Sequence, residues 1–209
     1  DYREVEEVAR EAFWNFYAPG CDEHYLLHIM RSSPNFVKGL DFVAVADRKI
    51  VGIVVFLKSF ILTDDGCKYE VLSMGPIAVL PQYQRMGIGR MLIAHTRKIA
   101  AEMGYRAILL CGEPRYYSKV GFEAAEHFNI RTSEDKYFAA LHVCPLYPDA
   151  LAGVSGRYYE DVIYNIDSDK AKEFDKLFPR KERIEGTSSQ KRFEEVLAMQ
   201  KNYKSSSDK

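Results

Sequence analysis

The stretch that decides the fold is MGPIAVLPQYQRMGIGRM, residues 74–91. Its apolar first half predicts a strand, and the periodic apolar residues that follow predict a long helix running to Met103. Two glycines, Gly87 and Gly89, fall at the turn between them. They let backbone N–H groups converge without an obstructing Cβ, at the positive end of the helix dipole, which suits a pyrophosphate. A tight turn that binds nothing is the alternative interpretation.

Two arginines flank this turn. Arg85 and Arg90 can add positive charge beside a bound phosphate. A dinucleotide-binding turn needs GxGxxG, but Leu92 stands three residues after Gly89. The P-loop string GxxxxGK followed by Ser or Thr does not occur in the sequence. The turn therefore matches neither of these nucleotide-binding motifs.

Hydrophobic periodicity and turn residues divide the rest of the chain into alternating elements. Gly75-Pro76 interrupts one strand and predicts a bulge or a splayed edge. The order of elements predicts a mixed α/β sheet with helices between strands. In chain order, we expect helices over 4–17 and 22–30, strands over 41–46, 49–57 and 69–80, the long helix, a strand over 105–111, a short helix over 114–120, and strands over 137–144 and 162–166.

The composition shifts after Ile166. We expect residues 1–166 to form one domain and residues 167–209 to form a C-terminal helical extension and tail. Thr187 and Gln190 fit a capping box at the start of a tail helix over 190–200. Its apolar face predicts docking on its own domain or on a second subunit, as in a homodimer. That face consists of Phe193, Val196 and Leu197.

Composition excludes several classes of protein. Twenty-nine basic and thirty acidic residues give a net charge of −1, which argues against a surface dominated by nucleic-acid binding. The longest apolar run, residues 50–57, is too short to span a membrane. The four cysteines form no CxxC pair and the histidines are scattered, which predicts no metal site and a cytoplasmic location. Cys111 and Cys144 are expected to act as small buried hydrophobes.

Three motifs together resemble the GNAT superfamily of N-acetyltransferases. Gln84-x-x-Gly87-x-Gly89 resembles its (Q/R)xxGx(G/A) motif, residues 77–81 resemble its fourth strand, and residues 116–122 resemble its YxxxGF ending. The resemblance covers residues 1–166 and is especially close to one bacterial branch of predicted acetyltransferases. It implies a mostly antiparallel sheet of six to seven strands with a splayed central pair. The Asn that many members carry before the tyrosine helix is replaced by Gly112-Glu113-Pro114.

The resemblance also implies the cosubstrate and its contacts. Acetyl-CoA would donate an acetyl group to a small-molecule or peptide amine, with no metal, nucleic acid or membrane involved. Tyr117 falls on the tyrosine that many members use as general acid. A backbone N–H near Val79 or Leu80 would polarise the thioester carbonyl. The implied cofactor-binding residues are Ile77, Ala78, Val79, Gln84, Arg85, Met86, Gly87, Ile88, Gly89 and Arg90.

The general base and the acceptor stay open at this point. Glu70, Ser73 and His142 are candidates for the base, alongside a water relay or an amine that arrives neutral. Side chains alternate along a strand, so Glu70 and Ser73 face opposite ways unless a bulge intervenes. A non-catalytic acyl-CoA-binding module with a partner-binding tail is the alternative function. Nucleic-acid binding through the basic tail is a weaker one.

Overall fold

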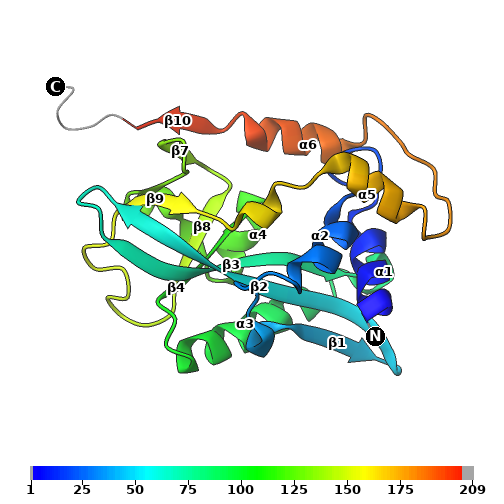
Figure 1. The fold of residues 1–209 in the computed structure, drawn as a ribbon, viewed down its shortest axis with the longest axis horizontal. Coiled ribbons are helices and arrows are strands. Elements are labelled where there is room, and N and C mark those ends of the chain that lie inside the picture. Colours follow the sequence, from blue (N-terminus) through cyan, green and yellow to red (C-terminus); the bar gives the residue numbers. More distant parts are fainter. Residues whose placement is uncertain (1, 204–209) are drawn as a thin grey trace. The chain divides into compact units, whose positions relative to one another are not determined.

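The computed structural model describes residues 2–203 and has a mixed α/β fold, a mixed sheet with flanking helices, as expected (Figure 1). The chain forms two compact units. Unit 1 takes in the chain up to Leu57, Met74–Thr96 and Asp161–Glu194; unit 2 takes in Lys58–Ser73, Arg97–Glu160 and the chain from Glu195 onward. The elements that pass from one unit to the other are β2 (Lys49–Thr63), β3 (Lys68–Val79), α3 (Ile88–Glu102) and α6 (Ser188–Leu197).

The core of unit 1 is made by the helices α1 and α2 and by the first part of β2. Val8 and Leu27 from the helices and Ile53 from the strand are fully or almost fully buried in it. The antiparallel partner of β2 here is β1. Besides its parts of β2, β3, α3 and α6, the unit contains α1 (Tyr2–Phe13), α2 (Glu23–Met30), α5 (Ser168–Asp175), β1 (Phe42–Ala46) and the short 3-10 helices Lys38–Leu40, Pro81–Tyr83 and Val162–Tyr164.

Unit 2 contains most of the sheet, in the strand order β5-β8-β4-β3-β2-β9-β6. The pairs β3–β4 and β6–β9 are parallel, and β4–β8, β5–β8 and β2–β9 are antiparallel. A separate ladder joins β7 to β10. The elements are β4 (Ala107–Cys111), α4 (Pro114–Tyr117), β5 (Glu123–Ala124), β6 (Ile130–Arg131), β7 (Lys136–Phe138), β8 (Leu141–Pro145), β9 (Gly156–Tyr159), β10 (Gln200–Asn202) and the 3-10 helices Ser118–Val120 and Ala125–Phe128.

The first helix ends four residues earlier than its apolar periodicity predicts. Asn15 adopts a left-handed conformation with a φ of 58°, which stops the helix after Phe13. The Asn15 side chain accepts hydrogen bonds from the backbone N–H groups of Gly20 and Ile184. These bonds stabilise the turn, and Phe16, which was expected on the buried helix face, is 46% exposed.

Two strand predictions near the C-terminus are wrong. The run over 137–144 is divided between β7 and β8, because its two halves pair with different strands. Residues 162–166 begin with a 3-10 turn instead of a strand. The Asp161 carboxylate accepts a hydrogen bond from the Ile163 N–H and so caps this turn. The strand in this part of the chain is β9, which begins six residues before the predicted one. The polar strand β10 was not predicted.

The predicted capping box is present. The Gln190 N–H donates to Thr187 Oγ1 at 3.2 Å, and the Thr187 N–H donates to Gln190 Oε1 at 3.3 Å. Gln190 Nε2 also donates to the carbonyl oxygens of Ile184 and Asn15. The apolar face of α6 is in contact with its own chain, since the Phe193 ring lies 4.7 Å from the Tyr17 ring. The domain boundary at residue 167 stays a prediction.

The segment after α5 is tied to α1 by a buried charge. Arg10 is 3% exposed; its Nε donates to the Asp175 carboxylate at 2.7 Å, and its Nη2 donates to the Pro179 carbonyl at 3.0 Å. His24 Nε2 lies 3.2 Å from the same carboxylate, and burial lowers the pKa of His24. One acidic side chain thus compensates the buried guanidinium.

Asp175→Ala should lower the free energy of unfolding by about 3 kcal/mol, because it leaves the Arg10 charge buried and unpaired. Urea unfolding at pH 7 measures this loss. The control is Asp169→Ala in the same helix, whose 91% exposed carboxylate pairs with Lys172 and should matter by less than about 1 kcal/mol. Equal small losses in both variants would contradict the structural importance of Asp175.

Candidate functional site

The strand-to-helix turn of unit 1 presents a row of backbone donors. Gly87 has a φ of 89°, and α3 begins at Ile88. The first helical hydrogen bond runs from the Met91 N–H to the Gly87 carbonyl at 3.0 Å. The N–H groups of Ile88, Gly89 and Arg90 therefore have no acceptor inside the helix. They point out of the positive end of a fifteen-residue helix.

Close packing fixes this turn on the sheet. A Cβ added to Gly52 of β2 would lie 3.2 Å from side-chain atoms of both Ile88 and Leu92. Gln84 Nε2 donates to the Val79 carbonyl at 3.0 Å, so the side chain of the motif joins the turn to the end of β3. The Leu80 N–H donates to the Val51 carbonyl at 2.9 Å. Leu80 is thus not free to polarise a thioester, and Val79 stays the predicted donor.

All ten residues predicted to bind the cofactor lie on the end of β3 or in this turn. Ala78 and Ile88 are buried, and Ile77, Val79 and the two glycines are half-buried. The polar and flexible members of the set are exposed; these are Gln84, Arg85, Met86 and Arg90. Buried residues position the turn, and exposed residues are available to a ligand.

Tyr117 of unit 2 lies at the end of the short helix that follows β4. Its ring packs directly on Gly112: a Cβ added to Gly112 would lie 2.1 Å from Tyr117 Cε2. This contact explains why the chain has a glycine at position 112, in the segment where many GNAT members carry an Asn. Gly121, with a φ of 88°, closes the helix C-terminus, and Arg97 Nη1 donates to the Val120 carbonyl beside it.

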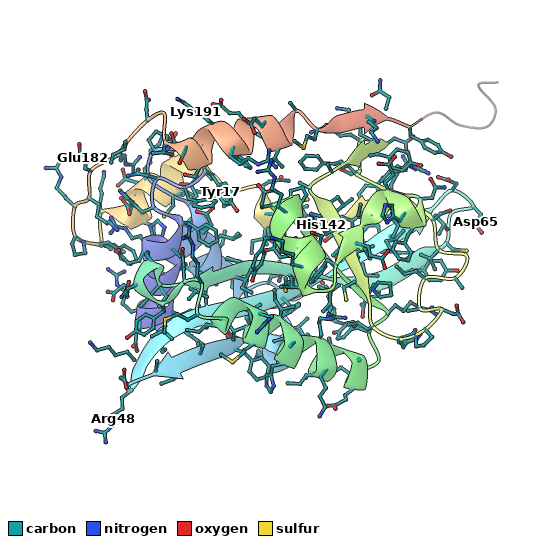
Figure 2. All side chains as sticks on the ribbon, turned by 180° about the vertical axis from the view of Figure 1, so that it is seen from behind. Tyr17, Arg48, Asp65, His142, Glu182 and Lys191 are labelled. Atoms are coloured by element: carbon teal, nitrogen blue, oxygen red, sulfur yellow. The ribbon has the colours of Figure 1, made fainter. Side chains whose placement is uncertain are left out.

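Aromatic rings surround Tyr117. The rings of Phe122 and His142 lie 5.7 and 5.6 Å from it, centroid to centroid, and Figure 2 labels His142 beside α4. His142 is buried, and burial lowers its pKa, so the imidazole is neutral at pH 7. The neighbouring Tyr116 is 41% exposed and meets Tyr117 edge to face. The two tyrosines therefore have different environments.

Two of the candidate bases have environments that do not suit a base. Glu70 is exposed and forms an ion pair with Lys58 at 3.3 Å. Ser73 is 1% exposed and forms a hydrogen bond with the Tyr158 hydroxyl. The opposite orientation of Glu70 and Ser73 follows the alternation expected of a strand.

Sequence reasoning missed Glu23, at the start of α2 in unit 1. The carboxyl group is half-buried, and the loss of water around it raises its pKa to about 7, with the nearby Asp22 charge adding to the effect. The Asp22 N–H donates to it at 3.1 Å. Within residues 2–203, no basic side chain forms an ion pair with Glu23, whereas Glu6 pairs with His28 at 2.9 Å. Nothing local in the sequence distinguishes Glu23 from a helix-start glutamate on the surface.

Two further residues were missed in unit 2. Cys111, expected to be a buried hydrophobe, is exposed, and Glu160 is exposed as well. Surrounding protein nevertheless displaces enough water to raise the pKa of both groups, and the Glu160 charge contributes to the shift at Cys111. Cys144 is buried, as expected.

Over residues 2–203, no group of three or more His, Cys, Asp or Glu side chains is placed to hold a metal ion. Over the same residues, no helix has the length and apolar character needed to cross a bilayer.

Comparison with known proteins identifies the family. The family model described as "Acetyltransferase (GNAT) domain" matches residues 39–124. The uncharacterized N-acetyltransferase YhbS of Escherichia coli K12 is 33% identical over 157 residues, which cover 68% of this chain and 91% of YhbS. The fold and the sequence define a GNAT acetyltransferase. This chain belongs to the GNAT acetyltransferase family and is an N-acetyltransferase by that membership.

Solved structures agree with this assignment. The crystal structure of E. coli YhbS in complex with CoA matches 79% of this chain and 87% of its own, with a TM-score of 0.69 and 29% identity. A GNAT acetyltransferase from Brucella melitensis, in complex with acetyl-CoA, shares the fold with a TM-score of 0.62 and 22% identity, over 78% of this chain and 92% of that one.

Glu23→Gln should stabilise the protein at pH 8 and have little effect at pH 5. A pKa raised from 4.5 to about 7 means that the folded state disfavours the carboxylate. This destabilisation is absent below the unfolded pKa, grows as the pH rises to about 7, and is complete above it. Melting temperatures of both proteins at the two pH values measure it. The control is Glu7→Gln, an exposed carboxylate, whose effect should not change with pH in this way. A constant difference for Glu23→Gln would contradict the shifted pKa.

Proposed function

We propose that the protein transfers the acetyl group of acetyl-CoA to a primary amine of a small molecule or peptide. The observation that carries the proposal is the turn before α3, where the backbone N–H groups of Ile88, Gly89 and Arg90 have no helical acceptor and the side chains of Arg85 and Arg90 add positive charge. The binding of CoA by YhbS and of acetyl-CoA by the Brucella protein supports it. We further propose that the pyrophosphate of acetyl-CoA accepts hydrogen bonds from these donors.

Acetyl transfer requires formation of a C–N bond, breakage of the C–S bond and protonation of the departing thiolate. The amine nitrogen attacks the thioester carbon, the C–N bond forms, and the C–S bond then breaks to release a thiolate. Tyr117 donates its phenolic proton to that thiolate, since a tyrosine with a pKa near 10 is protonated at neutral pH. The backbone N–H of Val79 is the proposed donor to the carbonyl oxygen as charge develops on it. The packing of Tyr117 on Gly112 supports its role, because a ring held in one position is suited to proton transfer.

We propose that the attacking amine loses its proton through a water relay or arrives neutral. Among the candidate side chains, His142 is buried, and Glu70 is exposed and paired with Lys58, and neither environment suits a base. Four free cysteines within the chain are consistent with work in a reducing compartment such as the cytoplasm.

The activity is tested by incubating the protein with acetyl-CoA and a panel of primary amines, and by following the release of free thiol. Acetyl transfer should release thiol only in the presence of an accepted amine, and mass spectrometry should find the acetylated product. A non-catalytic acyl-CoA-binding module would bind acetyl-CoA and release no thiol with any amine.

Gly89→Glu should weaken acetyl-CoA binding at least tenfold, or by about 1.4 kcal/mol. The new carboxylate repels the pyrophosphate, while a negative charge in the first turn of a helix does not disturb folding. Isothermal titration calorimetry measures the affinity. The matched control is Ala94→Glu, an exposed position later in the same helix, which should bind normally. Unchanged affinity in Gly89→Glu would disprove the phosphate-site assignment.

Tyr117→Phe should reduce turnover on the order of 10²-fold or more, and leave acetyl-CoA affinity nearly unchanged, because it removes only the proton donor. Steady-state kinetics with an accepted amine, alongside calorimetry, separates the two effects. Tyr116→Phe is the matched control and should keep its turnover. Similar modest losses in both variants would point to packing, and full turnover in Tyr117→Phe would end its assignment as general acid.

A further inference from the structure

His142 lies beside the segment of unit 2 that carries Tyr117. The strand β8 runs between β4 and β5, and His142 is in register with Leu110 on β4 and with Ala124 on β5. The chain leaves the sheet after β4 and returns to it at β5, so the segment over 112–122, which includes α4, is inserted between the two neighbours of β8. Both ends of this segment therefore adjoin the strand that carries His142.

The side chains of His142 and Tyr117 lie on the same face of the sheet. The Gly112 N–H donates to the Ala140 carbonyl at 2.9 Å, so the ladder between β4 and β8 continues to Gly112. Gly112 shares a face with Leu110, because side chains alternate along a strand, and a Cβ added to Gly112 would meet both the Tyr117 ring and the Leu110 side chain. Leu110 is the cross-strand neighbour of His142, and such neighbours share a face. The contact between the rings of Tyr117 and His142, 5.6 Å apart, agrees with this placement.

The backbone of Tyr117 is fixed, so the rotation of its side chain decides where the phenol lies. The Tyr117 N–H donates to the Glu113 carbonyl at 3.2 Å, and the Tyr117 carbonyl accepts from the Phe122 N–H at 3.2 Å. Gly112 contacts the ring on one side, and the Phe122 ring meets it edge to face. The His142 ring faces it at an interplanar angle of 36°. These three contacts define one orientation of the phenol.

His142 contributes to this arrangement through its flat ring. The side chain is 3% exposed, so it has little room to turn away. Neither ring nitrogen forms a well-aligned hydrogen bond with residues 2–203. Burial lowers the pKa of His142 and outweighs the backbones of Gly112 and Glu123, which favour the charged ring, so the imidazole is neutral at pH 7. On the other side of His142, Ala124 offers only a methyl group, which leaves the imidazole as the larger support.

We propose that His142 is a positioning residue for the general acid: its ring holds the Tyr117 phenol in the orientation from which it protonates the leaving thiolate. This inference rests on the proposed acetyl transfer and adds to it a residue that touches neither the acetyl group nor the amine. The placement of a reacting group matters, because a displacement of about 1 Å costs on the order of 10²-fold in rate.

The first test measures kcat, KM and the dissociation constant of acetyl-CoA, with butylamine, 1,4-diaminobutane and a lysine-containing peptide as probe amines. His142→Ala should lower kcat by at least about tenfold, because the phenol loses its support, and should leave acetyl-CoA affinity unchanged. His142→Phe should keep the wild-type kcat, since phenylalanine supplies a flat ring and no titratable group. His142→Leu fills the space without a flat ring, and it should show the same loss as His142→Ala if the alanine variant does not fold.

The matched control is Val143→Ala on the same strand. Val143 is fully buried and points to the opposite face, where it belongs to another core cluster with Leu109. This variant also loses buried volume, and it should keep its kcat.

A double variant shows whether His142 acts through Tyr117. Adding His142→Ala to Tyr117→Phe should cause little further loss of kcat, because the hydroxyl that His142 positions is already absent. A further loss as large as that of His142→Ala in the wild type would contradict the proposal.

The second test needs no turnover. A single 3-fluorotyrosine at position 117 reports the surroundings of the ring by fluorine NMR. In His142→Ala its resonance should move toward that of the free amino acid, and in His142→Phe it should stay distinct from it. The same label at position 116, whose side chain is 41% exposed, should respond less.

The outcomes separate this inference from the proposed function. If the wild type acetylates an amine and His142→Ala keeps the wild-type kcat, the positioning role is disproved and the acetyl transfer stands. Equal losses in His142→Ala and His142→Phe, or in His142→Ala and Val143→Ala, would also overturn it. If the wild type acetylates no probe, the proposed function fails for these amines, and the fluorine resonance decides: a shift confined to His142→Ala supports the contact, and an unchanged resonance disproves it.

Discussion

The close approach of α3 to β2 at Gly52 is the constraint on which the cofactor turn depends. A side chain at this position would meet Ile88, Leu92 and the carbonyl oxygen of Ala78. With glycine there, the first turn of α3 lies against the strand, and the helix N-terminus is held at a fixed height above the sheet. The free N–H groups of a helix can serve as a binding site only when their position is fixed in this way. One missing side chain on β2 thus positions donors that lie more than thirty residues later.

The features that the sequence predicted well depend on local chemistry. The turn before α3, the short helix that carries Tyr117 and the capping box of Thr187 and Gln190 each follow from a few adjacent residues. The mixed sheet followed from the order of strands and helices. Such features can be predicted because the deciding interactions span only a few positions in the chain.

The features that were missed depend on residues distant in the sequence. The run over 137–144 reads as one strand, and only pairing with β10 and with β4 divides it. Nothing in the sequence around Glu23, Cys111 and Glu160 sets them apart. Their raised pKa values come from the protein that surrounds them. Hydration and the absence of a partner are properties of tertiary structure. These two properties cannot be predicted from a single sequence, because they depend on which distant residues the fold brings close.

The segment over 179–187 has the composition of a flexible linker but not its contacts. Its carbonyl oxygens accept hydrogen bonds from Arg10 at Pro179, from Trp14 at Glu182 and from Gln190 at Ile184. A protease must pull a stretch of chain away from such contacts before it can cut, and linkers are cut readily because they have none. The three basic residues of this segment would therefore be poor sites for trypsin, in contrast to what their surface loop suggests. Resistance to digestion here is a property of side chains at the end of α1 and at the start of α6, and not of the loop itself.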